Sequence, residues 1–268
     1  MRIERNRVKR TLKRGDVALG TWVTIGNPEV AEILANVGFD WLVFDTEHAP
    51  LSLETVEWMI QATSGTGVVP LVRVAANDMV MVKRALDIGA YGVVIPLVNS
   101  REDAERAVSY TRYPPKGIRG AGPRRCSTYG MRSKEYFDWA GREILTIVQV
   151  ETAEAVANID EILSVEGVDV FFVGPTDLTM SLGIPGQQNH PKFVRAVEKV
   201  LEAGRRNGVC PGTMAYTLEE AQIALGRGFK FISLTTDFKH LVKGAKDMLD
   251  AVGETKTKGR PQRGRHQI

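Results

Sequence analysis

The chain has 268 residues, of which 43% are hydrophobic, and its formal net charge is +3. This content is enough for a large core. No apolar run approaches the ~20 residues of a membrane span, and the charged start of the chain is not followed by the apolar core of a signal peptide. The only cysteines are Cys126 and Cys210, which excludes a disulfide framework and a zinc knuckle. We therefore expect a soluble, cytoplasmic protein with no membrane partner.

The positive charge is concentrated at the carboxyl end. Residues 253–268 carry a net charge of +4, whereas the rest of the chain carries −1. A segment rich in Gly, Lys and Arg with almost no apolar residue cannot bury itself. We therefore expect one domain over residues 1–252 and a disordered basic tail over 253–268. Because no basic, aromatic-laced pattern occurs before the tail, a nucleic-acid partner is not expected.

Apolar runs alternate with helical patterns along the whole chain. The expected strands lie at 18–23, 41–44, 68–74 and 89–98, in the two runs that end at Glu151 and Asp177, and at 210–215 and 228–237. The expected helices lie at 3–14, 28–36, 52–64 and 78–88, after Ser100, at 152–167, 191–206 and 218–226, and at about 238–251. Asn27 before Pro28, and Ser100 before Asp103, are helix-start signals.

Eight strands that alternate with helices indicate an α/β fold. The strands are continuously apolar rather than alternating, which is typical of a parallel sheet covered on both faces. No change in composition marks a second domain, and the length is normal for a (β/α)₈ TIM barrel. We therefore predict a single-domain (β/α)₈ barrel, with a doubly wound open sheet as the lesser alternative.

One long segment interrupts the alternation before the fifth strand. Residues 110–143 are rich in proline and glycine and include Arg112, Arg119, Arg124, Arg125 and Arg132. Loops of this length inside compact domains are usually functional or form interfaces. These arginines could face an anionic substrate or a neighbouring subunit; the alternative is a solvated surface excursion.

Two carboxylates close neighbouring strands of the central strand, helix, strand unit. Glu151 follows the first strand of this unit and Asp177 follows the second. Because the carboxyl ends of parallel strands share one rim of a sheet, these side chains are expected to meet. Adjacent carboxylates repel unless one is protonated or a cation lies between them, and oxygen ligands suit Mg²⁺ or Mn²⁺. The alternative is that both residues are helix caps or surface charges.

Other polar side chains fall at the same rim, where barrels of this class hold their working groups. They are Trp22, Asp45, His48, Arg73, Gln149 and Asp237. Arg73 is suited to gripping a carboxylate or enolate with two donors. His48 is the only histidine at a strand end and can move protons near neutral pH, although a lone histidine is more often structural. Gln149 and Glu151 are two residues apart and share a face of their strand.

Several classes of chemistry lack the residues that they need. No strand interior carries the lysine of a Schiff-base aldolase, and the chain has neither a GxGxxG motif that opens a helix after a strand nor a GxxxxGK[ST] loop. Proton transfer or carbon–carbon bond chemistry on an anionic oxoacid, held by a divalent metal, remains.

The motifs DTEHAP, PLVRV, LDIGAYGVVIP, YPPKGIRGAG, VQVET and VGPTDLTMSLG occur in this order. Together they resemble the metal-dependent class II pyruvate aldolases of the HpcH/HpaI type, over about residues 12–250. The resemblance implies that the chain is an enzyme, a carbon–carbon lyase that uses Mg²⁺, Mn²⁺ or Co²⁺. It also implies a homo-hexamer built as a trimer of dimers. The basic tail lies outside the resemblance.

The resemblance also implies roles for individual residues. Glu151 and Asp177 would be the metal ligands, Arg73 would steady the enolate and His48 would be the general base. Asp45 and Asp87 would support His48; because Asp87 falls near the end of a helix, it would act from an adjacent subunit or through unusual geometry. The substrate site would be lined by Gln149, Thr176, Asp177 and Trp22. Position 176 is Thr where the family is expected to have Ala.

The implied reaction is the reversible cleavage of a 4-hydroxy-2-oxoacid to pyruvate and an aldehyde through the enolate of pyruvate. The expected partners are therefore a small 2-oxoacid and an aldehyde. Two alternatives stay open: oxaloacetate decarboxylation or a phosphoenolpyruvate or CoA-ester lyase on the same barrel, and a barrel that binds a metabolite without catalysis. The sequence does not identify the aldehyde.

Overall fold

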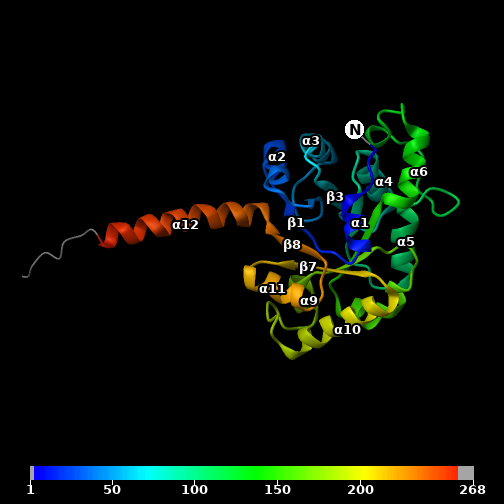
Figure 1. Ribbon diagram of the computed structural model, residues 1–268. Helices are drawn as coiled ribbons and strands as arrows, with labels where there is room; N and C mark the ends of the chain where they lie inside the picture. Colours follow the sequence, from blue (N-terminus) through cyan, green and yellow to red (C-terminus); the bar gives the residue numbers. More distant parts are fainter. Residues whose placement is uncertain (1–2, 259–268) are drawn as a thin grey trace, which may run out of the picture.

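The computed structural model describes residues 3–258, and its centre is a closed barrel of eight parallel strands, β1 to β8 (Figure 1). The strands are β1 Ala18–Val23, β2 Trp41–Asp45, β3 Val69–Arg73, β4 Gly92–Ile95, β5 Leu145–Val150, β6 Val170–Val173, β7 Cys210–Ala215 and β8 Phe231–Thr236. Because β1 also pairs in parallel with β8, the sheet has no edge. The predicted barrel is confirmed, and the open-sheet alternative is wrong.

Helices surround the barrel. They are α1 Arg7–Lys13, α2 Pro28–Val37, α3 Leu53–Ala62, α4 Met79–Asp87, α5 Arg101–Thr111, the 3₁₀ turn η1 Arg125–Ser127, α6 Ser133–Glu143, α7 Ala153–Ala157, α8 Ile159–Leu163, α9 Pro175–Ser181, α10 Pro191–Asn207, α11 Leu218–Gly226 and α12 Asp237–Lys258. The Ser100–Asp103 capping box is present. The helix expected over 152–167 is split at Asn158 into α7 and α8. The short helix α9, which begins after Gly174, was not expected.

Aromatic packing fills the interior at the end where the strands begin. The rings of Trp41 and Phe231 stack with their centroids 4.0 Å apart. A β-carbon at Gly20 would lie 2.1 Å from the Trp41 ring, so only glycine fits beside this stack. Helix α1 contributes Val8 to the same interior cluster, and Lys9 donates to Asp169 at 2.9 Å. This end of the barrel is therefore packed shut, which leaves chemistry to the opposite rim.

The long segment before β5 is not a bare loop. Helix α6 occupies its second half and packs through the buried side chains of Tyr136 and Trp139. The guanidinium of Arg119 is fully buried, and Arg125 donates to the carbonyl of Ile88 at 3.0 Å, just beyond the end of α4. Helices in this fold run back from the rim, so their ends lie at the opposite end of the barrel. Arg119 and Arg125 therefore do not face a substrate at the rim: Arg119 donates to the Asp87 carboxylate and the Tyr136 hydroxyl, and Arg125 donates to the Ile88 carbonyl and the Ser64 hydroxyl.

Helix α12 leaves the barrel instead of packing on it (Figure 1). It was expected to end at about 251, but it continues to Lys258, so the first residues of the expected tail are helical. Residues 259–268 of that tail lie outside the described part of the chain. Between residues 3 and 258, no helix is both long and apolar enough to cross a membrane.

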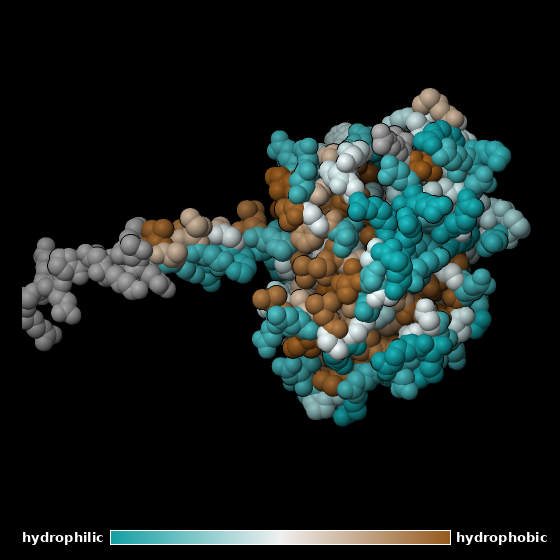
Figure 2. All heavy atoms as spheres, in the orientation of Figure 1, coloured by the Kyte–Doolittle hydropathy of each residue, from teal (hydrophilic) through white to brown (hydrophobic). Residues whose placement is uncertain are grey.

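The projecting helix carries an apolar face. Leu241, Met248, Leu249 and Val252 recur at helical spacing, and each is at least half exposed. Figure 2 shows apolar side chains along one side of α12, with polar ones on the other. In a (β/α)₈ barrel the helix after the eighth strand normally belongs to the outer ring, between the helices that follow strands seven and one. Here those neighbours, α11 and α2, also expose apolar residues, namely Ile33, Val37, Leu218 and Ile223.

Candidate active site

The ends of β2 and β3 hold a buried ion-pair network. Arg73 donates from Nε to Asp45 Oδ1 at 2.9 Å and from Nη2 to Asp45 Oδ2 at 2.6 Å. Its Nη1 lies 2.9 Å from Glu47 Oε2. Because β2 and β3 pair with Asp45 opposite Arg73, the register itself produces this two-pronged contact. The guanidinium is consequently fixed in one orientation.

Trp22 packs beneath this guanidinium. The Arg73 Cζ lies 4.4 Å from the centroid of the Trp22 ring, a cation–π arrangement. The same ring meets Phe172 edge-on at 5.7 Å. Trp22 Nε1 is buried and has no hydrogen-bond partner among the described residues. Trp22 therefore forms the floor beneath Arg73 at the rim.

A second buried group lies at the end of β5. Gln149 Nε2 donates to Glu151 Oε2 at 2.6 Å, and the backbone N–H of Leu97 donates to Glu151 Oε1 at 2.8 Å. Leu97 has φ 52°, a left-handed conformation that is uncommon for a side-chain-bearing residue. Burial raises the pKa of Glu151, the Leu97 bond opposes that shift, and the charges of Glu47 and Asp177 raise the pKa further. The carboxylate is thus held in place in a setting that favours a nearby cation.

Asp177 and Thr176 lie in the first turn of α9 rather than at the end of β6. Both are exposed. The charge of Asp177 raises the pKa of Glu47 as well as that of Glu151, so these carboxylates are within electrostatic range of one another. Helix α9 approaches closely because Gly174 precedes it: a β-carbon there would lie 3.3 Å from Glu151 Oε2. That Glu151 and Asp177 lie close enough to share a cation stays a prediction.

His48 extends from the loop after β2 and is largely exposed. Its Nε2 lies 3.9 Å from Glu47 Oε2. Asp45, which was expected to support the histidine, accepts from the backbone N–H of His48 at 3.4 Å and is otherwise committed to Arg73. Asp45 therefore orients the loop, and the carboxylate next to the imidazole is that of Glu47.

Two of the predicted positions are engaged elsewhere. Asp87 lies at the last turn of α4, and its Oδ1 accepts from Arg119 Nη2 at 2.6 Å. Within one chain this carboxylate is therefore committed to Arg119 at the end of α4, and no contact with His48 occurs among the described residues. Asp237 is at the rim as expected, but its carboxylate accepts from Thr24 and from the N–H of Ile25 at 2.7 Å. That carboxylate ties β8 to the loop after β1.

Sequence reasoning gave no role to Glu47, Leu97 or Gly174. Glu47 could have been found, because it follows Asp45 by two residues and directly precedes the rim histidine. Gly174 had a weaker signal, a glycine at the start of the GPTD turn. Leu97 had none, because its contribution is a backbone N–H in an unusual conformation.

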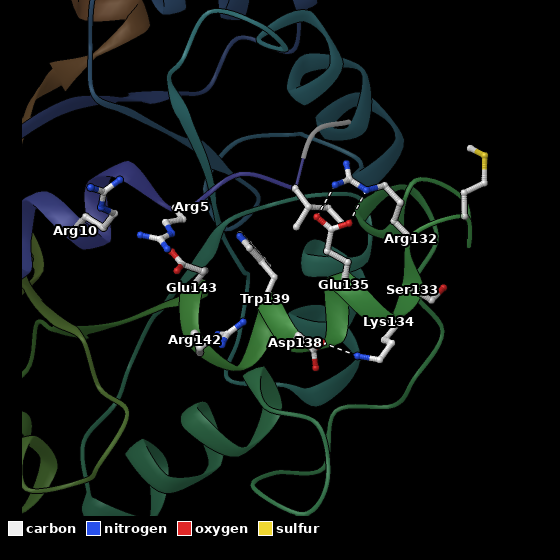
Figure 3. A pocket seen from close by; sticks show the side chains of 12 residues that line it. Arg5, Arg10, Arg132, Ser133, Lys134, Glu135, Asp138, Trp139, Arg142 and Glu143 are labelled. Carbon is white, nitrogen blue, oxygen red and sulfur yellow. Dashed lines mark hydrogen bonds and ion pairs between the residues drawn. The ribbon is translucent and has the colours of Figure 1, made fainter.

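A hollow of about 800 Å³ lies elsewhere, between α6 and the N-terminal segment (Figure 3). Two ion pairs lie within its lining: Arg132 Nε donates to Glu135 at 2.7 Å, and Lys134 donates to Asp138 at 3.2 Å. The indole N–H of Trp139 donates to a backbone carbonyl at 2.6 Å. The hollow thus lacks the convergent, buried polar groups of the rim.

The donors at the rim fit a hard divalent cation. No group of three or more His, Cys, Asp and Glu side chains that could hold a metal occurs within residues 3–253. Mg²⁺, however, is commonly held by only one or two carboxylates together with substrate and water oxygens. Glu151 and Asp177 supply two such carboxylates, and the buried Oε1 of Gln149 has no partner in the described part of the chain. These oxygens fit Mg²⁺ or Mn²⁺ better than a softer ion.

Known proteins resemble this chain over most of its length. The profile of the family described as HpcH/HpaI aldolase/citrate lyase matches residues 18–244. The 5-keto-4-deoxy-D-glucarate aldolase of Shigella dysenteriae serotype 1 is 39% identical over 233 residues, which are 87% of this chain and 91% of the relative.

Solved structures agree in fold. An HpcH/HpaI aldolase/citrate lyase family protein from Burkholderia cenocepacia J2315 has a TM-score of 0.89 and 36% identity, and the match covers 92% of this chain and 99% of that one. The citrate synthase SbnG has a TM-score of 0.84 and 29% identity, with 93% and 98% covered.

The burial of Arg119 leads to a test of Asp87. Asp87→Asn removes the charge opposite a fully buried guanidinium, and should lower the free energy of unfolding by about 3 kcal/mol. Urea denaturation followed by circular dichroism measures this change. As a control, Asp138→Asn breaks an exposed i,i+4 pair with Lys134 and should alter stability by less than about 0.5 kcal/mol. Equal effects of the two substitutions would contradict the buried pair.

Proposed function

The chain belongs to the HpcH/HpaI aldolase/citrate lyase family and is a carbon–carbon lyase of the aldolase type, and we propose that it cleaves a 4-hydroxy-2-oxoacid to pyruvate and an aldehyde. The observation that carries this proposal is the arrangement of polar side chains at the carboxyl ends of the strands. A fixed guanidinium at the ends of β2 and β3 faces a site whose other side holds the buried oxygens of Gln149 and Glu151. Such a site suits an anionic oxoacid whose charge moves onto an enolate oxygen during reaction.

We propose that Glu151 and Asp177 hold a divalent cation, Mg²⁺, Mn²⁺ or Co²⁺. When bound, such an ion would supply positive charge next to the oxoacid and relieve the repulsion among the rim carboxylates. The support lies in the donor set: two carboxylates within electrostatic range, a free amide oxygen on Gln149, and a glycine at 174 that leaves room beside Glu151.

Arg73 is proposed to stabilise the negative charge that develops on the enolate oxygen. An arginine has five N–H donors, and here two of them are donated to Asp45, while Nη1 forms an ion pair with Glu47. The remaining donors are proposed to serve substrate oxygens. Because the acidic residues hold the guanidinium before substrate binds, little reorganisation is needed during reaction, which is where such stabilisation is most effective.

His48 is proposed to take the proton from the C4 hydroxyl of the oxoacid. As that proton leaves, the C4 oxygen becomes the aldehyde carbonyl, the C3–C4 bond breaks, and its electron pair forms the enolate of pyruvate. Protonation at C3 then gives pyruvate. Glu47 Oε2 lies 3.9 Å from the imidazole Nε2. Trp22 and Thr176 are proposed to line the substrate site.

We propose that the chain assembles with copies of itself, into a hexamer built as a trimer of dimers. The support on the structural side is α12, whose apolar face projects from the barrel, together with the exposed apolar residues of α2 and α11 on either side of the surface that an eighth helix would cover. A second copy supplies a helix of matching length and pattern. We also propose a cytoplasmic location, supported by the two unpaired cysteines.

The metal and the activity can be tested together. The protein, loaded with Mg²⁺, Mn²⁺ or Co²⁺, should form an aldol adduct from pyruvate and an aldehyde, detected by mass spectrometry, and treatment with a chelator should abolish turnover until metal is restored. Glu151→Gln should weaken Mn²⁺ binding in calorimetry, whereas Glu154→Gln, in the first turn of α7, should not. Incubating the metal-loaded protein with oxaloacetate tests the alternative reaction, decarboxylation. Full activity of the chelated protein would rule out the metal.

Arg73→Lys should lower kcat by ~10²–10³, because a point charge cannot reproduce a two-donor fork and the loss falls on the transition state. Steady-state kinetics measures the change. Arg84→Lys is the matched control, an exposed arginine of α4, and should retain normal turnover. Near-normal kcat for Arg73→Lys would remove Arg73 from this role.

Charge placed on the apolar face of α12 should break the assembly. The double substitution Leu241→Asp and Leu249→Asp is expected to lower the mass seen by light scattering after gel filtration. Lys246→Asp, an exposed polar position of the same helix, should keep the mass of the parent protein. The far-ultraviolet spectrum should show an intact barrel in both. An unchanged mass for the double variant would exclude α12 as the contact.

A further inference from the structure

A second hollow, of about 280 Å³, lies at the end of the barrel where the strands begin. It is bordered by the C-terminal ends of α1, α10 and α11 and by the start of β7. Three basic side chains line it, those of Arg205, Arg227 and Lys230, and none of the other described residues in its lining is acidic. We call it the Arg227 hollow.

The helix ends at this hollow do not need the basic side chains as caps. Basic residues near a helix C-terminus often donate to its last carbonyl groups. Here backbone N–H groups already do so: Val209 donates to the carbonyl of Gly204 at 3.0 Å, and Phe229 donates to that of Ala224 at 3.0 Å. Two helix C-termini together carry a partial charge of about −1, so three cations leave an excess of roughly +2.

The three cations also lack acidic partners. No ion pair or side-chain hydrogen bond joins any of them to another described residue, and Nη2 of Arg227 is buried without an acceptor. The neighbouring Arg206, by contrast, pairs with Asp160 at 2.6 Å and with Glu202 at 3.1 Å. A buried donor without an acceptor costs free energy. An anion in the hollow would remove that cost.

The charge of Lys230 acts on the lining of the hollow. Burial raises the pKa of the Cys210 thiol to about 12, and the charge of Lys230 opposes that shift. The carboxylate of Asp169 also raises this pKa, but it pairs with Lys9 at 2.9 Å and accepts from the N–H of Thr146 at 3.0 Å. The nearby acid is thus engaged on the side of α1, and the positive charge in the hollow is left for a ligand.

We propose that the Arg227 hollow binds a phosphate monoester of a small metabolite. A phosphoryl group carries a charge of about −1.5 to −2 near neutral pH, which matches three cations without an acid. Arg205 and Arg227 offer planar pairs of donors to its oxygens, and Lys230 adds a point charge. Leu12 and Leu201 lie beside the organic part of the ligand.

This site is separate from the proposed reaction centre. Cys210 is the first residue of β7, and Lys230 directly precedes β8, whereas the polar groups of the rim lie at the other ends of the strands. A strand of this length spans roughly 20 Å. A ligand in the Arg227 hollow therefore cannot touch a substrate at the rim, and the aldol reaction does not depend on it.

Calorimetry with glycerol 3-phosphate tests the site, with inorganic phosphate and glycerol as comparison probes. The ester should bind more tightly than inorganic phosphate, and glycerol should not bind. Arg227→Met and Lys230→Met should each weaken binding of the ester at least tenfold, because a hydrogen bond to a charged group is lost. Parent affinity in both variants, or no binding by the parent protein, would overturn the proposal.

Two control variants locate the ligand. Arg206→Met makes the same change next to Arg205 on α10, at an arginine that already has acidic partners, and should keep the parent affinity. Arg73→Lys alters the cation of the rim and should also keep it. Loss of binding in Arg73→Lys, with Arg227→Met unaffected, would place the ligand at the rim and exclude the hollow.

Hydrogen exchange in the parent protein gives a measurement that does not depend on how the variants fold. Glycerol 3-phosphate should slow amide exchange in residues 204–212 and 227–231, which border the hollow. Residues 133–143 of α6, which do not line it, should exchange at the same rate with and without the ester. Slowing that is absent from the first two segments would contradict binding in the hollow.

Discussion

The rim depends on the ion pair that joins Arg73 to Asp45 across β2 and β3. Barrel register sets the two residues opposite each other, so the contact follows from how the strands pair. With Asp45 accepting two hydrogen bonds and Glu47 forming an ion pair, the guanidinium is held over the Trp22 ring. A cation that is already oriented and desolvated can act on a developing negative charge without first being rearranged.

The acidic residues around this cation impose an opposing constraint. Glu47, Glu151 and Asp177 lie within electrostatic range, and burial together with like charge raises the pKa of Glu47 and of Glu151. A folded chain that keeps such carboxylates close together gives up stability at neutral pH. Hydrogen bonds from Leu97 and Gln149 offset part of this loss. A divalent ion would offset much of the rest, so the site and its cofactor are best understood together.

One end of the barrel is packed for stability, and the other end carries the candidate active site. At the end where strands begin, the Trp41–Phe231 stack, helix α1 and the buried Asp87–Arg119 pair close the structure. At the other end, backbone groups and acidic side chains hold the polar groups in place, yet some of their hydrogen-bond donors and acceptors remain unused. Helix α12 belongs to both: its first turn is fixed at the rim, and its remainder offers an apolar face to a partner.

The sequence alone determined the barrel, because strand and helix periodicity is local and most strands are runs of apolar residues. It also determined which polar residues stand at strand ends, since Arg73, Glu151 and Asp45 are located by counting along a strand. Which way each long side chain points, and which residues it contacts, was decided only by tertiary structure. Arg119 turns into the protein because Asp87 and Tyr136, distant in sequence, enclose it together with the nearby Tyr113. Lys239 meets Tyr216 only because β7 and β8 are neighbours, and no pattern in the chain records whether α12 packs on its own barrel. The contacts of long side chains and terminal helices depend on which residues folding brings near them. Those contacts are set by desolvation and geometry, which the spacing of residues along the sequence does not encode.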